Sequence, residues 1–573
     1  MIAHRAPISG VAAHGGRLIA TAGYDNQVVL WDAAERIALG RAYHDHLANQ
    51  LAFSPDGTRL VSASSDYTAR LWSVPDLKLL AVLADHDDDV EMAAFHPSAP
   101  LVATASRDHA VRLFDFTGAL KAKLAGHAAD VISLAWSADG GALVSSSDDG
   151  TIKRWSLADA ALLEDIDLGG VETDTVALDG AGTIYAGNDE GAILTIRGDR
   201  RTRIEAHAAG VKRLVYEPRE NLLVSLSYDR TMRIWTPRGS QADGLAPVAG
   251  ATLPAAVWAR SCAFLDGGTL IFATFGSCYA VYDLAADRWD LDGVGPTEGV
   301  NAVAIWNGAR ATIGDAGLLN IAGRPAGGPG SLCNFLIAFA GRLVTGGQMG
   351  AVMDAHSGAV LHQHSSPLNC AAVFARGGVP HLIVGAYTGE GLVFAEDDGG
   401  ALQQVATLTC HANAVKSVAA SAERLFTVSA DAGAAWFAVE DLSETGRVER
   451  AHGRIANGCA ALPDGRFASV SRDRMLRIWR GPDSAVEVVE TPHDHSIKCV
   501  AASADGRWIA CGAYDGKVAL YDAGRRRWAA VRRPTAAGVS SLCYEAASGC
   551  FLAGSYDGQV YEIPAAQYRK DDR

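Results

Sequence analysis

Serine, histidine and aspartate recur together along this chain of 573 residues, and these three residue types form nucleophilic triads in many hydrolases. His127, Ser145 and Asp149 form one set, and further sets follow the same order. A working triad also needs a pocket and an oxyanion hole. The chain contains no GxSxG, no HExxH and no complete SxxK-type signature. We therefore expect no catalysis from these sets, and we predict that the protein is not an enzyme.

Histidine pairs with a spacing of two occur at 44/46, 362/364 and 493/495, and such pairs could place two metal ligands on one face of a strand. No third ligand accompanies any pair. The ten cysteines all lie from Cys262 onward, and none forms a CxxC pair. The sequence thus predicts neither a metal nor another cofactor.

The elements that carry these residues repeat with a period of about 41 residues. In the segment Ser146–Trp155, SSDDGTIKRW, a tryptophan follows Asp149 by six positions. The same frame of aspartate and aromatic recurs at Asp25/Trp31, Asp66/Trp72, Asp108/Phe114, Asp229/Trp235, Asp473/Trp479 and Asp515/Tyr521. Asp557 keeps the aspartate without the aromatic, and Asp189 and Asp431 fall on the same grid.

Each period predicts about four short antiparallel strands. Alternating apolar runs such as LVSSS and TIKRW are typical of strands, and turns with Asp and Gly join them. A single small sheet of this kind cannot bury both faces, but sheets stacked radially cover one another. We therefore expect an all-β fold of propeller type.

These units resemble WD40 repeats, with WD-type endings such as Trp31-Asp32 and a Gly-His start at Gly126-His127. The resemblance implies one buried tetrad of His, Ser or Thr, Asp and Trp in each well-formed blade. The matching sets are His44, Ser62, Asp66, Trp72; His127, Ser145, Asp149, Trp155; His207, Ser225, Asp229, Trp235; and His452, Ser469, Asp473, Trp479. It implies a structural role for most of these histidines, including one from each His-x-His pair.

Counting the periods gives about fourteen units, which favours two seven-bladed propellers in tandem. The predicted domains are residues 1–293 and 294–573, with the boundary near Asp290–Thr297. The arrangement resembles that of actin-interacting protein 1 in architecture alone, because its actin-binding residues cannot be matched. The fifth unit lacks the His and the Trp, and units seven to ten, roughly 245–396, are degenerate and could form a ligand pocket. The C-terminal tail, QYRKDDR, is expected to fray.

Several other residue groups are expected to be structural. Six cysteines, Cys262, Cys333, Cys370, Cys459, Cys499 and Cys543, fall in the first strand of their units, where a small apolar residue packs well. The basic runs at 200–203 and 525–533 are expected on outer strands, either blocking strand addition or meeting an acidic partner. The acidic run Asp85–Asp89 is interpreted as a solvated loop.

The residue that precedes the turn aspartate is expected to face the rim of a WD40 ring. Tyrosine and arginine are enriched there, and both types dominate interface hot spots. Lysines stand at the start of the first strand in three units, near the expected channel mouth. The partner-binding candidates are Tyr24, Arg107, Lys212, Tyr228, Lys416, Arg472, Lys498, Tyr514 and Tyr556.

Composition and charge restrict the expected partners and location of the protein. A net charge of -15 disfavours nucleic acid and anionic lipid as partners. The N-terminus does not match a secretory signal, and no apolar stretch is long enough to span a membrane, so a cytoplasmic location is expected. Frequent Arg, Ala and Gly favour a GC-rich, bacterial source. We predict a non-catalytic scaffold or adaptor in a regulatory or effector complex, with a separately encoded effector enzyme as one candidate partner. The alternatives are a small-ligand sensor and, least favoured, a propeller enzyme.

Overall fold

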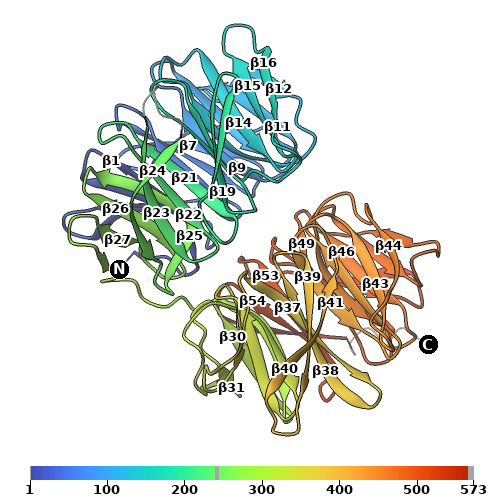
Figure 1. Cartoon of the computed structure of the whole chain (residues 1–573). Helices are drawn as coiled ribbons and strands as arrows, with labels where there is room; N and C mark the ends of the chain where they lie inside the picture. The colour runs from blue at the N-terminus through green and yellow to red at the C-terminus, as the bar shows by residue number, and fades with distance from the viewer. Residues whose placement is uncertain (1, 239–243, 566–573) are drawn as a thin grey trace. The chain divides into compact units, whose positions relative to one another are not determined.

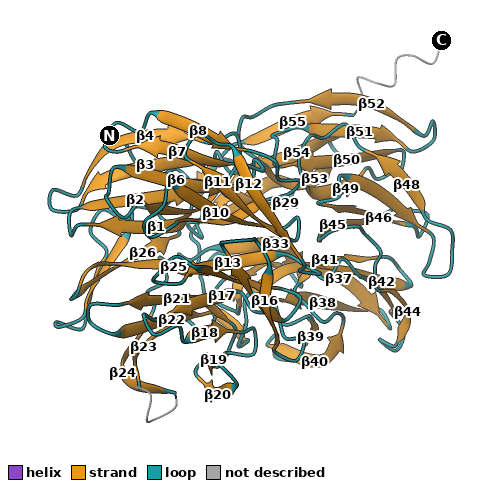
Figure 2. Ribbon diagram, turned by 90° about the horizontal axis from the view of Figure 1, so that it is seen from above, coloured by secondary structure: helices purple, strands orange, loops and turns teal. Residues whose placement is uncertain are grey.

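The computed structural model describes residues 2–238 and 244–565, and within these ranges it contains strands, turns and loops but no helix (Figure 2). The chain divides into two compact units, Met1–Thr297 and Glu298–Arg573. Each unit is a β-propeller whose sheets are arranged like blades (Figure 1). The tail expected to fray lies outside the described residues.

The first unit has seven sheets of four consecutive antiparallel strands among its described residues. The sheets are β1 (Ile8–His14), β2 (Leu18–Gly23), β3 (Gln27–Asp32), β4 (Ile37–Tyr43); β5 (Ala48–Phe53), β6 (Arg59–Ser64), β7 (Ala69–Ser73), β8 (Leu79–Leu83); β9 (Val90–Phe95), β10 (Leu101–Ser106), β11 (Ala110–Asp115), β12 (Leu120–Ala125); β13 (Val131–Trp136), β14 (Ala142–Ser147), β15 (Thr151–Ser156), β16 (Leu162–Asp167); β17 (Thr175–Leu178), β18 (Ile184–Gly187), β19 (Ala192–Arg197), β20 (Arg200–Glu205); β21 (Val211–Glu217), β22 (Leu222–Ser227), β23 (Thr231–Pro237), β24 (Leu245–Thr252); and β25 (Val257–Asp266), β26 (Thr269–Thr274), β27 (Ala280–Asp283), β28 (Arg288–Asp290).

The second unit has six four-stranded sheets and one three-stranded sheet among its described residues. They are β29 (Val300–Trp306), β30 (Ala309–Gly314), β31 (Asn320–Ile321), β32 (Arg324–Pro325); β33 (Cys333–Phe339), β34 (Arg342–Gly347), β35 (Ala351–Asp354), β36 (Val360–Gln363); β37 (Leu368–Arg376), β38 (Val379–Ala386), β39 (Glu390–Glu396), β40 (Leu402–Thr409); β41 (Val415–Ala420), β42 (Arg424–Ser429), β43 (Ala434–Ala438), β44 (Glu444–Val448); β45 (Ala456–Ala461), β46 (Phe467–Ser471), β47 (Met475–Trp479), β48 (Glu487–Glu490); β49 (Ile497–Ala502), β50 (Trp508–Ala513), β51 (Val518–Asp522), β52 (Arg527–Arg532); and β53 (Val539–Glu545), β54 (Cys550–Ser555), β55 (Val560–Pro564).

The first strand of each sheet is the innermost one, and each contacts the first strand of the next sheet around its ring. The first ring closes where β1 meets β25, and the second closes where β29 meets β53. At the first closure Ser261 Oγ accepts a hydrogen bond from Val11 N over 3.1 Å. At the second, Arg310 pairs with Glu545 over 2.8 Å. Each ring is closed by packing between its first and last sheets. No sheet combines strands from the two ends of a unit, because every sheet consists of strands that are consecutive in the chain.

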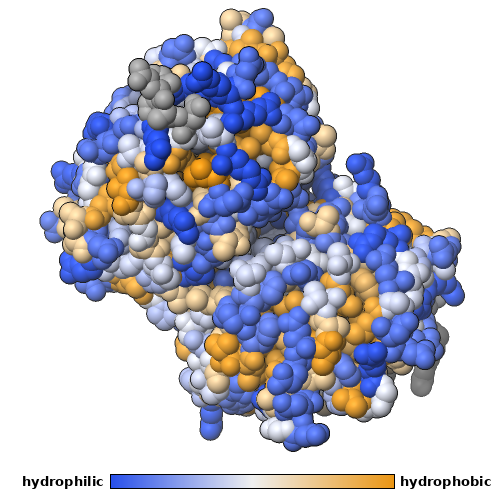
Figure 3. All heavy atoms as spheres, viewed as in Figure 1, coloured by the Kyte–Doolittle hydropathy of each residue, from blue (hydrophilic) through white to orange (hydrophobic). Residues whose placement is uncertain are grey.

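The core lies between neighbouring sheets rather than at one centre. Val144 and Ile152 of one blade, for example, pack on Val176 and Ile184 of the next. The fourth strands are amphipathic, and several of their apolar side chains, such as Ile37 and Leu163, are more than half exposed. Figure 3 accordingly shows apolar patches separated by hydrophilic residues on both units.

Candidate partner-binding site

Each predicted tetrad places its histidine between an aspartate and a serine. In the fourth blade His127 Nδ1 lies 2.9 Å from Asp149 Oδ2, and His127 Nε2 lies 2.8 Å from Ser145 Oγ. Trp155 Nε1 donates to the same hydroxyl over 2.9 Å. An ionised carboxylate only accepts, so Nδ1 carries the proton and Nε2 accepts from the serine. The blades containing Ser62 and Ser225 have the same contacts.

The tetrad aspartates hold their negative charge strongly. Burial alone would raise the pKa of Asp149, but hydrogen bonds from His127, the Ala128 amide and Thr151 hold it well below its usual range. The carboxylate therefore ties the loop that contains His127 to the turn between β14 and β15. This network is closed and buried, with no access for a substrate, and it supports the structural interpretation over a catalytic one.

The set around His452 differs from the expected pattern. His452 Nδ1 is 3.7 Å from Asp473, and Arg477 Nη1 lies between them, at 2.8 Å from the ring nitrogen and 2.7 Å from the carboxylate. The blade with His86 has the same insertion, by Arg112. Burial lowers the pKa of His452, and Arg477 lowers it further, so the neutral ring accepts from the guanidinium.

One complete tetrad was not predicted from the sequence. His4 lies 2.9 Å from Asp25 and 2.7 Å from Thr21 Oγ1, which accepts from Trp31 Nε1 over 2.8 Å. Two signals could have found it. Threonine replaces serine conservatively, and the spacing of seventeen residues from His4 to Thr21 equals that from His452 to its serine.

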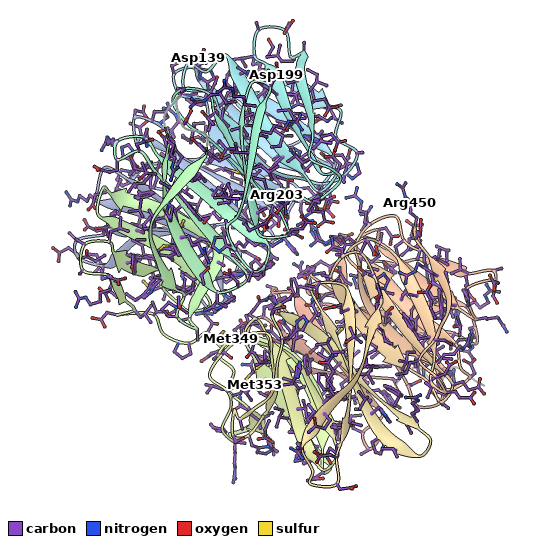
Figure 4. The ribbon with its side chains drawn as sticks, viewed as in Figure 1. Asp139, Asp199, Arg203, Met349, Met353 and Arg450 are labelled. Carbon is purple, nitrogen blue, oxygen red and sulfur yellow. The ribbon has the colours of Figure 1, made fainter. Side chains whose placement is uncertain are left out.

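The remaining groups lie largely where their patterns placed them. The six first-strand cysteines are on innermost strands, and burial raises the pKa of Cys262 and Cys459 to about 12, which makes them poor nucleophiles. Arg203 lies on the outermost strand β20, where it pairs with Glu190 and Glu205 (Figure 4). The second basic run falls on β52, which is also outermost.

The solvated interpretation of the acidic run is wrong for part of it. Asp88 and Asp89 are 3% and 6% exposed. Their backbone carbonyls accept hydrogen bonds from Ser106 Oγ and Arg107 N, so the loop folds inward against the end of β10. The position of this acidic loop is thus set by its hydrogen bonds to the residues at the end of β10.

One backbone hydrogen bond defines a rim position in every blade of the described chain. The amide that follows the second strand donates to a carbonyl just ahead of the first strand, as Tyr514 does to Ser496. The rim residues of the first unit are Tyr24, Ser65, Arg107, Asp148, Asp189, Tyr228 and Phe275. Those of the second are Asp315, Gln348, Tyr387, Ala430, Arg472, Tyr514 and Tyr556. Asp189 is therefore a rim residue, not the turn aspartate that its place on the grid predicted.

A second position, which we call the inner position, lies two residues after the accepting carbonyl. A β-bulge at this point makes Lys212, Lys416 and Lys498 the extra residue of the innermost strand. The other inner residues of the second unit are Asn301, Asn334, Asn369, Asn457 and Ser540. Each of these five donates a hydrogen bond to the first carbonyl of the next innermost strand. In this unit the side chain at the inner position therefore usually connects its blade to the next one by a hydrogen bond.

In the first unit the charged candidates are neutralised by carboxylates of their own and of neighbouring blades. Lys212 pairs with Asp174 and Asp189, and these carboxylates, with burial opposing them, hold its pKa well above the usual value. Arg107 pairs with Glu91 and Asp130 over 2.5 Å each. Lys212 also lies over the Tyr228 ring at 4.7 Å. These contacts compensate both cations within the ring.

The aromatic candidate Tyr24 packs edge-on against Trp258 with ring centroids 5.3 Å apart. It is half-buried, as is Tyr228. Both charged candidates of the first unit therefore have partners from their own ring, and both aromatic candidates are partly covered.

In the second unit the candidates form a basic and aromatic group over consecutive blades. Lys416 lies over the Tyr387 ring at 4.9 Å, and Tyr514 stacks on Tyr556 with centroids 6.1 Å apart and ring planes within 6°. Gly538 lies between the two stacked rings, and a Cβ there would come within 3.1 Å of both. The stack is thus tightly packed, with the two tyrosines half-buried.

The charges of two lysines of this group act on the same thiol, that of Cys370 on the innermost strand β37. Burial raises the pKa of Cys370, while the charges of Lys416 and Lys498 both act on that thiol in the opposite direction. Lys498 makes no ion pair among the described residues. Arg472 adds a third cation at the rim between the two lysine-bearing blades.

Tyr387 was missed because its repeat is degenerate. The segment Ala-Tyr-Thr-Gly at 386–389 aligns with Ala-Tyr-Asp-Gly at 513–516, with Thr388 in place of the turn aspartate. That alignment would have assigned Tyr387 to the rim position that Tyr514 occupies in its own blade.

Comparison with protein families agrees with this architecture. Seven segments match the WD40 model, described as WD domain, G-beta repeat. They are residues 1–32, 40–73, 77–115, 118–156, 198–236, 444–480 and 487–522. The chain is a WD40-repeat protein. The fifth and seventh blades of the first unit and most of the second unit fall outside these segments yet form the same kind of sheet, since alternation and turns suffice to fold them.

Two curated proteins resemble parts of this WD40 protein. A subunit of chromatin assembly factor 1 from Gallus gallus is 23% identical over 225 residues, covering 38% of this chain and 30% of its own. The transcriptional corepressor LEUNIG_HOMOLOG of Arabidopsis thaliana is 22% identical over 276 residues, covering 39% of this chain and 34% of its own. The WD40 chain therefore spans about a third of the length of either relative. The likeness to actin-interacting protein 1 stays a prediction.

Two kinds of feature are absent from the described residues. They contain no helix long and apolar enough to cross a membrane. They also contain no group of three or more His, Cys, Asp or Glu side chains arranged to hold a metal ion.

Proposed function

We propose that this WD40 protein is a non-catalytic scaffold that recruits an acidic segment of a partner protein to the face of its second unit. The main observation behind this proposal is that lysine replaces the neutral Asn or Ser at two inner positions of that ring. Five sister positions use Asn or Ser to hold the next blade. Lys416 and Lys498 occupy the same bulge and bring a positive charge to it.

Charge and shape around these lysines support the same proposal. Arg472 contributes a further cation, and the Tyr514–Tyr556 stack supplies a rigid aromatic platform beside it. Tyr and Arg are the residue types that contribute most at protein interfaces. The whole chain carries a charge of -15, so a basic face on one ring favours an acidic ligand locally.

The setting that we propose is a bacterial, cytoplasmic complex with a regulatory or effector role. A separately encoded effector enzyme is one form that the partner can take. The two relatives, one named for chromatin assembly and the other as a corepressor, support an assembly role in general terms.

The test is affinity purification of the full chain from its native host, followed by mass spectrometry. The decisive variant is Lys416→Asn/Lys498→Asn, because asparagine is the residue that sister blades use. It should fold normally and lose the partner that the unaltered protein captures. Arg472→Ala/Tyr514→Ala/Tyr556→Ala should lose it as well.

A matched control removes the same charge elsewhere on this unit. Arg532 and Arg533 are exposed at the end of β52, and Arg532→Asn/Arg533→Asn should retain the partner. Retention of the partner by the lysine variant, or equal loss in the control, would contradict the proposal. So would the absence of a stoichiometric partner from the unaltered protein.

A further inference from the structure

The channel of the first unit contains an arginine whose charge no carboxylate of the described residues compensates. Arg213 follows the inner residue of β21 and lines a cavity of about 330 Å³ between the innermost strands. Its Nη1 contacts Met92 Sδ at 3.8 Å, and its Nε is buried without a hydrogen-bond partner. Within the described chain it forms no ion pair. A thioether sulfur is a weak acceptor, so this contact does not replace a carboxylate.

Two other arginines of this unit, the buried Arg112 and the half-buried Arg230, show how such a charge is compensated. Arg112 is 1% exposed and pairs with Asp108 over 2.8 Å. Arg230 lacks a carboxylate but donates to the carbonyls of Val257, Leu253 and Pro254. A half-buried cation without either kind of partner is still costly when one of its donors is fully buried, so it is usually explained by a ligand or a function.

The surroundings of Arg213 increase that cost. Burial lowers the pKa of its guanidinium, and the nearby charge of Arg260 lowers it further. Arg260 itself is compensated by Glu91 at 3.1 Å. The residues at the same place in the six other blades carry no charge; they are Gly10, Gln50, Met92, Ser133, Thr175 and Ser261.

The cavity has room for a small molecule beside this charge. It is lined by apolar groups such as Leu51 and Val215, by Cys262, and by the polar side chains of His14 and Ser54. The Cys262 thiol stays protonated, since burial raises its pKa to about 12, so it does not supply the missing anion. A guanidinium presents its donors in a fork that matches carboxylate and phosphate oxygens.

We propose that the channel of the first unit binds a small oxyanion, a phosphate or carboxylate group, with Arg213 as the residue that recognises it. The site is independent of the second-unit face, so either proposal can fail without the other. An anion bound here would neutralise the channel and stabilise the first ring.

The experiment titrates the full chain with inorganic phosphate and, in a parallel arm, with succinate, using calorimetry and thermal unfolding. Three variants are compared: Arg213→Met, Arg213→Lys and, as a charge control, the exposed Arg219→Met. The unaltered protein and Arg219→Met should bind at least one anion. Arg213→Met should bind it ~10-fold more weakly or not at all, with Arg213→Lys between them.

Anion-free unfolding gives a second readout with the opposite sign. Without anion, Arg213→Met should unfold at a higher temperature than the unaltered protein, because a half-buried charge without an ion-pair partner is gone. With anion, only proteins that keep a cation at this position should gain stability. The arm that binds more tightly identifies the group as phosphate or carboxylate. Failure of both anions to bind, or equal effects on Arg213→Met and Arg219→Met, would overturn the proposal.

Discussion

Two adjacent serines of β14 allow the tetrad to be tested against an internal control. Ser145 Oγ is 2.8 Å from His127 Nε2 and 2.9 Å from Trp155 Nε1. Ser146, the next residue, is equally buried, but its hydroxyl has no hydrogen-bond partner in the described structure. Ser145→Ala and Ser146→Ala therefore remove the same atom from the same strand with opposite consequences.

The magnitude follows from the groups left behind. Ser145→Ala leaves the Trp155 donor and the His127 acceptor buried and unsatisfied, at about 1 to 3 kcal/mol for each such group. We expect the free energy of unfolding of the first unit to fall by about 2 to 4 kcal/mol, because the two losses share one network and do not add fully. Ser146→Ala should be neutral or stabilising by up to about 1 kcal/mol, since it removes an unsatisfied hydroxyl.

Urea unfolding of the full chain, followed by tryptophan fluorescence and circular dichroism, measures both changes. The transition of the first unit should move to lower urea for Ser145→Ala and stay or rise for Ser146→Ala, with unchanged slopes. Equal destabilisation by the two variants would refute the reasoning, because it would mean that the loss reflects packing rather than hydrogen bonding.

Two further predictions concern charge. Lys212→Met should destabilise the first unit by about 2 to 4 kcal/mol in thermal or urea unfolding, because it leaves Asp174 and Asp189 unpaired; a neutral result would show that water already screens this cluster. Acid should weaken the second unit through Asp515, since His493 at 3.5 Å and hydrogen bonds from backbone amides outweigh burial and lower its pKa to about 2. A lowered folded pKa gives stability that is present above about pH 4 and lost as pH falls toward 2, so Asp515→Asn should flatten the dependence of unfolding on pH in that window, and an unchanged slope would contradict it.

Much of this protein follows from the sequence alone. The period of about 41 residues, the alternation within each strand and the Asp and Gly turns are local signals. They determined the blades and the all-β class, and the resemblance to WD40 repeats implied the contacts of Ser145 with His127 and Trp155. Even degenerate segments such as 245–396 fold into sheets, because burial of alternate residues does not require the tetrad.

Only the tertiary structure decided which charges are compensated. Lys212 and Lys498 have equivalent places in the repeat, since each is the second residue of an innermost strand. Yet Lys212 is neutralised by Asp174, 38 residues away on the neighbouring blade, and Lys498 makes no ion pair within the described chain. The sequence did not single out Arg213. That no carboxylate of the described residues pairs with it becomes visible only once the blades are assembled into a ring. The physical reason is that Coulomb energy depends on distance in space and on burial, and in a propeller both are set by the neighbouring blades.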